Sequence, residues 1–189
     1  MRPSVLSGEH LRLEPFQEND VCDRYVGWLN DPEVNRFLEV RHTVQTADSA
    51  LEYVRSFGGS EEKYMWAIRT IPGEEFIGTA TLQTIDRVHG SAELGILVGE
   101  RAYWGGTTAV DVLSLIIDFG FGALGLRRPS AGTYARHWGM NLIYKQLGFA
   151  REATLRSALQ FLPGEFCDGY RWGLLADEWD GEAVQGSSP

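Results

Sequence analysis

The chain has 189 residues, of which 43% are hydrophobic and 23% charged, and its formal net charge is −9. This length suits one domain with a buried core, and the composition excludes a disordered chain or a fibrous repeat. The negative charge disfavours nucleic acid and anionic membrane surfaces as partners, because the phosphate attraction that drives such binding becomes repulsion.

Neither the N-terminal stretch nor the cysteines show a pattern that would define the class of the protein. The N-terminal stretch has no apolar core of signal-peptide length and no run is long enough to span a membrane, so we expect a cytoplasmic protein. Cys22 and Cys167 are far apart and lack a CxxC or Cys/His pattern. We therefore expect reduced thiols, no disulfide framework and no metal site.

The first part of the chain is predicted to be one strand followed mostly by helix. Residues 11–14 alternate apolar and polar side chains, as a half-buried strand does, and Pro15 ends the run. Capping residues then predict three helix starts, at Asn19 or Asp20, at Asp31 followed by Pro32, and at Thr46.

From Tyr64 the apolar period changes to that of strands. A hairpin is predicted from 64–69 and 76–83, with 92–98 extending it. The later elements are predicted as a buried helix over 109–119, a strand over 128–135, a helix over 137–147, and strands over 149–156 and 169–175.

This order of elements indicates an α+β fold with one mixed, mainly antiparallel sheet. We expect a single domain over residues 1–179 and a flexible, polar C-terminal tail over 180–189.

The turn Arg101-Ala-Tyr-Trp-Gly-Gly-Thr-Thr-Ala109 joins a predicted strand to the long helix. The first N–H groups of a helix have no intrahelical partner and lie at the positive end of its dipole, so they can hold a phosphate. Gly105 and Gly106 would let a ligand approach the backbone, and Thr107 and Thr108 would add hydroxyl donors. The turn is therefore the candidate anion site.

Other nucleotide and hydrolase motifs do not fit. Gly120-Phe-Gly-Ala-Leu-Gly125 matches GxGxxG, but it closes a helical run instead of following a strand. No Gly-Lys-Ser/Thr follows a glycine loop, and no Gly-x-Ser-x-Gly elbow is present. Dinucleotide, P-loop and serine-hydrolase functions are therefore disfavoured.

Two motifs together resemble a known family. The run Tyr103-Trp-Gly-Gly-Thr-Thr-Ala109, followed after the long helix by Tyr144-Lys-Gln-Leu-Gly-Phe149, is similar to the GNAT superfamily of acyl-CoA N-acyltransferases. The Trp-Gly turn, the Leu-Asn-Asp-Pro-Glu-Val stretch from Leu29 and the chain length resemble its RimJ/RimL-like branch. The resemblance implies a single-domain GNAT-like fold and acetyl-CoA as co-substrate. The implied CoA contacts are Leu97, Val98, Arg101, Trp104, Gly105, Gly106, Thr107, Thr108 and His137.

The sequence departs from the family pattern at three positions. Thr107 stands where the pyrophosphate loop usually has a second small residue, although its N–H and hydroxyl can still donate. His137 and Met140 stand where the family often has Asn and Ser ahead of the Tyr element. These departures motivate one alternative, a non-catalytic acyl-CoA-binding module.

Acetyl transfer from a thioester to an amine requires a neutral amine, stabilisation of an oxyanion and a proton for the leaving thiolate. Glu93 shares a strand face with Gly95 and Leu97, so its carboxylate could accept the amine proton while Gly95 leaves room for the thioester. The resemblance implies Tyr144 as the acid and a backbone N–H near Leu97 or Val98 as the oxyanion donor. The structural alternatives to these catalytic roles are that Glu93 is a solvated or ion-paired strand residue and that Tyr144 packs in the core.

The acceptor pocket is expected in the variable segments around residues 28–44 and 161–170. Arginines beside a tryptophan suit an acceptor with a flat or apolar part and a phosphate or carboxylate, such as a nucleotide-linked amino sugar. The net acidity instead favours an aminoglycoside-like or peptide amine, and a solvated helix face is the structural alternative. The candidate acceptor contacts are Trp28, Asn30, Glu33, Arg36 and Arg41.

The sequence thus predicts an acetyl-CoA-dependent N-acetyltransferase. Direct transfer in a ternary complex is expected, because no Cys or Ser is placed for a covalent acyl-enzyme. The expected acceptor is a small-molecule amine, and a protein N-terminal amine, as in the ribosomal-protein branch, is the alternative. An exposed strand edge could pair two copies as a homodimer.

Overall fold

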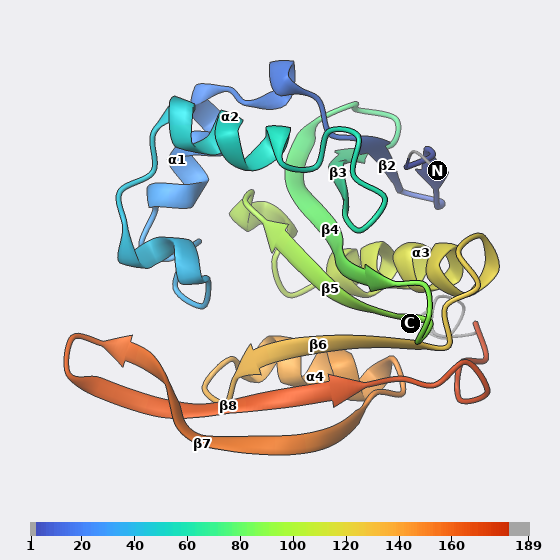
Figure 1. Cartoon of the computed structure of the whole chain (residues 1–189). Helices are drawn as coiled ribbons and strands as arrows, with labels where there is room; N and C mark the ends of the chain where they lie inside the picture. Colours follow the sequence, from blue (N-terminus) through green and yellow to red (C-terminus); the bar gives the residue numbers. More distant parts are fainter. Residues whose placement is uncertain (1–2, 182–189) are drawn as a thin grey trace.

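A computed structural model describes residues 3–181 and contains one eight-stranded sheet in the order β1-β2-β3-β4-β5-β6-β8-β7 (Figure 1). Every neighbouring pair of strands is antiparallel except β5 and β6, which confirms the mixed, mainly antiparallel α+β fold. Most of the expected tail, residues 182–189, lies outside the described residues. The strands are β1 (Leu6–Ser7), β2 (Leu11–Pro15), β3 (Tyr64–Thr70), β4 (Phe76–Asp86), β5 (Ser91–Val98), β6 (Arg128–Tyr134), β7 (Ala150–Leu162) and β8 (Glu165–Gly173).

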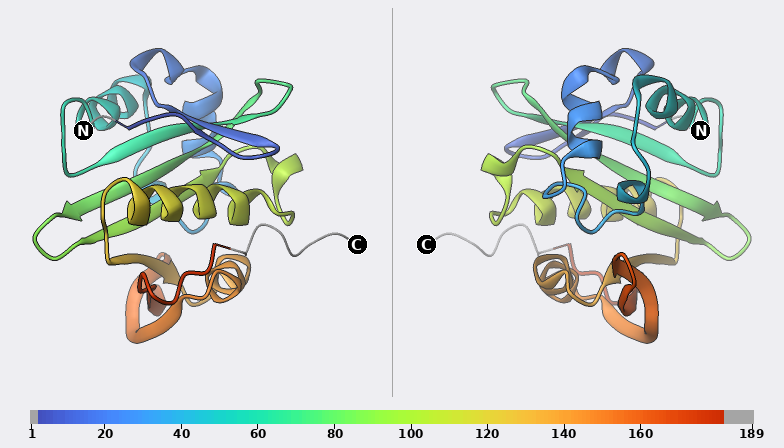
Figure 2. Two further views of the ribbon diagram at one scale, coloured as in Figure 1. Left: turned by 90° about the vertical axis from the view of Figure 1, so that its right-hand side faces the viewer. Right: turned by 90° about the vertical axis from the view of Figure 1, so that its left-hand side faces the viewer.

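Helices cover both faces of the sheet. Successive side chains of a strand point to opposite faces, so each face has its own apolar core. On β3, Trp66 and Ile68 join the core beneath α3 and α4, whereas Met65 and Ala67 join the core beneath α1 and α2. Figure 2 shows α3 lying across the strands. The helices are α1 (Asp23–Asn30), α2 (Ala47–Arg55), α3 (Thr108–Gly122) and α4 (Trp138–Gln146), with short 3₁₀ turns η1 (Glu18–Asp20), η2 (Glu39–His42) and η3 (Arg101–Tyr103).

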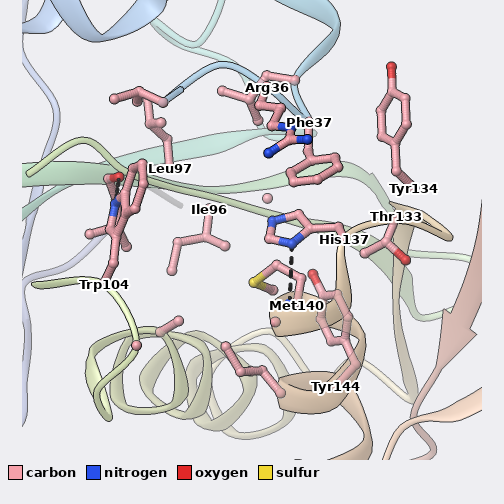
Figure 3. A pocket seen from close by; sticks show the side chains of 18 of the residues that line it. Arg36, Phe37, Ile96, Leu97, Trp104, Thr133, Tyr134, His137, Met140 and Tyr144 are labelled. Carbon is pink, nitrogen blue, oxygen red and sulfur yellow. Dashed lines mark hydrogen bonds between the residues drawn. The ribbon is translucent and has the colours of Figure 1, made fainter. Parts of the chain in front are cut away.

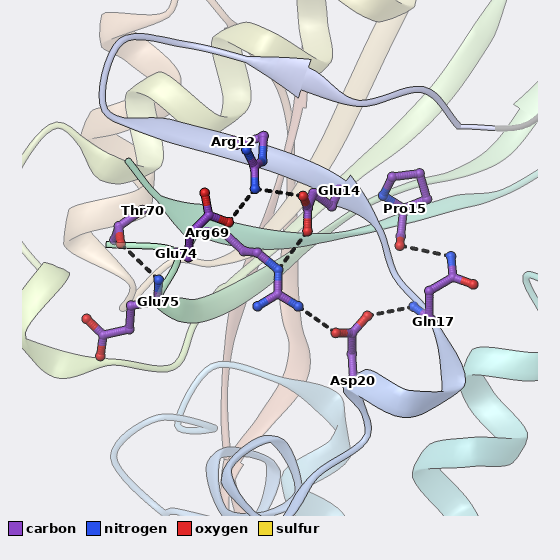
Figure 4. A network of polar contacts seen from close by, with 9 residues as sticks. All are labelled: Arg12, Glu14, Pro15, Gln17, Asp20, Arg69, Thr70, Glu74 and Glu75. Carbon is purple, nitrogen blue, oxygen red and sulfur yellow. Dashed lines mark hydrogen bonds and ion pairs between the residues drawn. The ribbon is translucent and has the colours of Figure 1, made fainter. Parts of the chain in front are cut away.

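The helix start predicted at Asn19 or Asp20 is wrong, because a polar network holds this segment as the turn η1 (Figure 4). Arg69 on β3 donates to Glu14 at 2.8 Å and to Asp20 at 2.6 Å. Arg12 pairs with Glu14 at 2.9 Å and also with Glu74. Because Asp20 is tied to β3, α1 begins only at Asp23.

The helix predicted after Asp31 is also wrong. The Asp31 carboxylate accepts from the Glu33 N–H at 2.9 Å, as a helix cap would, but the chain continues as turns. Val34 packs with the α1 core while Phe37 packs with Tyr134. The apolar residues therefore point to two different clusters, and no single helical face can satisfy both.

The other long elements confirm the prediction within a few residues. Thr46 caps α2 by accepting from the Ser49 N–H at 3.1 Å. The last hairpin is longer than predicted, with β7 reaching Leu162 and β8 starting at Glu165, and β1 was not predicted. Within residues 3–181, no helix has the length and apolar character needed to cross a membrane.

β5 and β6 separate soon after they pair. Their parallel pairing joins Ser91–Glu93 to Arg128–Ser130 and stops there. Beyond Glu93 the two strands diverge (Figure 1), so one edge of β5 has no strand partner. This gap in the sheet positions the site described below.

Gly99 allows the end of β5 to lie directly against α1. A Cβ atom at this position would lie 2.0 Å from the Trp28 ring, which is itself buried against Phe76 at a centroid distance of 5.0 Å. The ring has no open space into which it could move, because it is 7% exposed.

We therefore expect Gly99→Ala to lower the free energy of unfolding by about 1–3 kcal/mol through overpacking, measured by urea denaturation. Gly27→Ala is the matched control, because nothing lies within 4 Å of a Cβ atom at that position in α1. Alanine favours the helix, so the control should be neutral or stabilising. Equal losses in both variants would contradict this account.

Candidate active site

A cavity of about 550 Å³ fills the gap between β5 and β6 (Figure 3). Its walls come from four parts of the chain: residues 94–98 of β5, residues 103–106 before α3, residues 132–134 of β6, and the start of α4. The segment 33–38 lies across it. The cavity thus connects the predicted anion site with the predicted catalytic tyrosine.

The free edge of β5 supplies backbone groups to this cavity. The Gly99 N–H donates to the Ile77 carbonyl at 2.8 Å, and Leu97 pairs with Thr79 in the same register. Because antiparallel hydrogen bonds alternate, the backbone groups of Leu97 face β4, and those of Ile96 and Val98 face the gap. Alternation therefore favours Ile96 and Val98 over Leu97 as backbone contacts for a ligand.

The turn before α3 has the geometry of an anion site. Gly105 adopts a positive φ of 75°, and a Cβ atom at Gly105 or Gly106 would meet nothing within 4 Å, so a ligand can approach the backbone. Thr107 precedes the first residue of α3, and its hydroxyl donates to the Asp111 carboxylate at 3.0 Å. Backbone N–H groups, more than this hydroxyl, are therefore available to an anion.

Two predicted members of the turn have partners inside the protein. The Trp104 indole N–H donates to the Val98 carbonyl at 2.7 Å, which fixes the turn to the end of β5. Arg101 pairs with Asp31 at 2.7 Å and with Glu33. The Glu33 N–H and the Arg101 guanidinium lower the pKa of Asp31. Arg101 therefore ties the turn to the segment that crosses the cavity.

Tyr144 presents its hydroxyl to the cavity from a buried ring. The side chain is 2% exposed and packs against Phe149 and Trp172, at centroid distances of 5.0 and 6.0 Å. The hydroxyl points into the cavity (Figure 3) and has no hydrogen-bond partner among residues 3–181. Burial and the nearby Glu93 raise the pKa of Tyr144 above its usual range, so the hydroxyl stays protonated at neutral pH.

Glu93 lies at the last paired position of β5, where the gap opens. Its carboxylate accepts from the Arg171 guanidinium at 2.9 Å, and it is not itself a lining residue. A Cβ atom at Gly132, which does line the cavity, would lie 3.6 Å from Glu93 Oε1. The carboxylate therefore lies beside the cavity and is held by an arginine.

His137 lines the cavity at the start of α4. Its Nδ1 accepts from the Met140 N–H at 3.4 Å, and its ring stacks on Phe37 at a centroid distance of 4.2 Å. Burial lowers the pKa of His137 to about 4, so the imidazole is neutral at pH 7. With Nδ1 accepting, we assign the imidazole proton to Nε2.

The predicted acceptor residues divide into two groups. Glu33 and Arg36 line the cavity. Trp28 is buried in the α1 core, Asn30 donates to the Val26 and Gln45 carbonyls, and Arg41 donates to the Arg36 and Phe161 carbonyls. These three side chains hold the structure together and do not line the cavity. Sequence reasoning missed Phe37 and Tyr134, which are far apart in the chain and come together only in the folded structure, with ring centroids 5.9 Å apart.

Comparison with known proteins shows the family of the chain. A family model described as an acetyltransferase (GNAT) domain matches residues 10–150. The chain is similar to the uncharacterized N-acetyltransferase p20 of Bacillus licheniformis, with 28% identity over 173 residues, 90% of this chain and 94% of that protein. It is also similar to the uncharacterized N-acetyltransferase YoaA of Bacillus subtilis, with 27% identity over 154 residues, 80% of this chain and 86% of that protein.

Two solved structures share the fold. One is spermidine N-acetyltransferase from Vibrio cholerae in complex with CoA and spermine, with TM-score 0.80 and 18% identity, covering 89% of this chain and 96% of that one. The other is RimL, a ribosomal L7/L12 alpha-N-protein acetyltransferase in complex with CoA, with TM-score 0.80 and 15% identity, covering 93% and 99%. The chain belongs to the GNAT family of N-acetyltransferases, which confirms the family expected from the two motifs.

The neutral state of His137 predicts a pH dependence of stability. Between pH 4 and 6.5 the unfolded chain binds a proton on this histidine and the folded chain does not, so stability falls as the pH falls. His137→Asn keeps a capping side chain but cannot take up this proton. We expect the wild type to lose on the order of 2 kcal/mol more than His137→Asn between pH 7 and 4.

Urea denaturation of the two proteins at a series of pH values measures this difference. A difference in free energy of unfolding that stays constant from pH 7 to 4 would show that His137 is not held neutral by the fold.

Proposed function

We propose that this N-acetyltransferase moves an acetyl group from acetyl-CoA to a primary amine of a small molecule, by direct transfer in a ternary complex. One observation carries the proposal: a single cavity runs from the anion site at the start of α3, along the free edge of β5, to the hydroxyl of Tyr144. No cysteine or serine of residues 3–181 lines this cavity, which supports direct transfer over a covalent acyl-enzyme.

The residues present fit a CoA thioester. Gly105, Gly106 and the first N–H groups of α3 suit the pyrophosphate, because the backbone there is open and at the positive end of the helix dipole. Along the free strand edge, Ile96 offers its N–H and carbonyl and Val98 its N–H to the pantetheine amides, as an added strand would require, while the Val98 carbonyl accepts from Trp104. Acetyl-CoA would supply an activated acetyl group and a thiolate leaving group.

Glu93 is the residue that would accept the proton of the acceptor amine. Its position at the opening of the gap, next to Gly132, supports a transfer directly or through one water molecule. Arg171 pairs with the carboxylate at 2.9 Å and fixes its orientation. The backbone N–H of Ile96 or Val98 would bind the developing oxyanion.

Tyr144 would hold the proton that the departing thiolate takes up. Its ring is fixed by Phe149 and Trp172, so the hydroxyl keeps one direction and needs no rearrangement. A phenol is protonated at neutral pH, and the raised pKa of Tyr144, caused by burial and the nearby Glu93, means that the developing thiolate must lie close enough to take the proton directly.

Tyr144→Phe is expected to lower kcat by about 10²–10⁴-fold, because only the proton donor is removed. The measurement is thiol release from acetyl-CoA with a transferable amine. The affinity for acetyl-CoA, measured by calorimetry, should change little because the ring still fills the core. Wild-type turnover in this variant would exclude Tyr144 as the acid.

Glu93→Gln is expected to lower kcat/KM by a factor of about 10² or more at pH 7, with partial recovery at higher pH where the amine loses its own proton. Arg171→Gln is the comparison variant, because it removes the ion pair and keeps the Glu93 carboxylate itself. A pH–rate profile for Glu93→Gln that runs parallel to the wild type would rule out the base role.

A further inference from the structure

Arg36 lies at the cavity with its guanidinium free for a ligand. The guanidinium lies 5.5 Å from the centroid of the Phe37 ring and 5.5 Å from that of Phe161. Phe37 in turn lies between Arg36 and the His137 ring (Figure 3). The Arg36 guanidinium therefore lies at the end of a stack of aromatic rings, at the edge of a mainly apolar cavity.

Arg36 differs from the charged groups around it, because each of those has a partner. Arg36 forms no ion pair with any residue of the described chain, although it is exposed and within reach of the cavity. The charged groups that are already paired are Glu33 with Arg101, Glu39 with the Tyr134 hydroxyl at 2.6 Å, Arg136 with Glu165 at 2.5 Å, and Glu93 with Arg171.

The segment that carries Arg36 is held in place before any ligand arrives. Arg41 donates to the Arg36 carbonyl at 2.7 Å and also to the Phe161 carbonyl on β7. The Arg41 guanidinium lies 5.4 Å from the centroid of the Tyr134 ring. Because the backbone at Arg36 is fixed, binding a ligand there orders only one side chain, which keeps the entropic cost small.

We infer that Arg36 binds an anionic group, a carboxylate in particular, on an acceptor amine whose apolar or aromatic body lies along the apolar wall of the cavity. This inference rests on the proposed function and assigns its substrate class. Guanidinium binds carboxylate through two parallel hydrogen bonds, which also orients the acceptor. A polyamine finds an unpaired cation here and no unpaired carboxylate among the described cavity-lining residues, so polyamines are poor acceptors.

The net charge of −9 does not oppose this inference. Charges farther away than the Debye length of about 8 Å are largely screened at physiological salt. Glu33 shares Arg101 with Asp31, and Glu39 accepts from the neutral Tyr134 hydroxyl, but none of these carboxylates pairs with Arg36, so its guanidinium is available to an anion.

The test compares two amines that differ by one carboxylate, 4-(aminomethyl)benzoate and benzylamine, with spermidine as the polycation. Thiol release from acetyl-CoA gives kcat/KM for the wild type, Arg36→Gln, Arg36→Lys and Arg136→Gln. Arg136 is the matched control, because it lies 4.7 Å from the Phe161 ring centroid but is paired with Glu165 and does not line the cavity.

We expect the wild type to prefer the carboxylate amine over benzylamine by about tenfold or more, as a charged hydrogen bond provides. Arg36→Gln should bring this ratio close to one, Arg36→Lys should keep part of it, and Arg136→Gln should keep all of it. Spermidine should be the poorest acceptor.

Equal or better use of benzylamine or spermidine by the wild type would overturn the inference, as would a ratio that survives Arg36→Gln. If Arg36 instead binds a phosphate of CoA, Arg36→Gln would raise the KM for acetyl-CoA with both amines and leave their ratio unchanged, which also overturns it. A chain that binds acetyl-CoA but transfers to none of these amines would contradict the proposed function and the inference together.

Discussion

The site depends on one feature of strand pairing, the short parallel contact between β5 and β6. Three residues on each strand pair, and the strands then separate. A sheet edge inside a fold leaves backbone donors and acceptors without partners, which is costly unless a ligand or water satisfies them. The gap therefore explains why backbone groups of β5, the hydroxyl of Tyr144 and the start of α3 share one cavity.

The segment between α1 and α2 closes this gap from the other side by side-chain contacts. Asp31 and Glu33 bind Arg101 at the anion site, and Arg41 fixes the segment to β7. Phe37 stacks on His137 at the start of α4. The parts that would bind CoA and the parts that would bind the acceptor are thus joined by ion pairs and ring contacts. A substitution in one part therefore alters the packing of the other.

Apolar periodicity, capping residues and short motifs in the sequence predicted much of the fold and part of the site. Two parts of the site were predicted from local sequence patterns. One is the continuous run of strand, glycine turn and helix around Gly105, and the other is the helix that carries Tyr144. The periodicity and composition of each run are enough to predict these elements. Residues with long-range partners could not be assigned in this way. Trp28 and Arg41 have the composition of a binding site, yet one fills the space beside Gly99 and the other bonds to backbone carbonyls of β7. Only their contacts in the folded structure show that Trp28 and Arg41 are structural residues, whereas Arg36 lines the cavity.

The crystal structure of the complex with CoA is the measurement that tests the central claim most directly. The account predicts the pyrophosphate on the N–H groups that follow Gly105, the pantetheine arm along Ile96 and Val98, and the sulfur within hydrogen-bond reach of the Tyr144 hydroxyl. Binding of CoA outside the gap between β5 and β6, or a sulfur directed away from Tyr144, would contradict it.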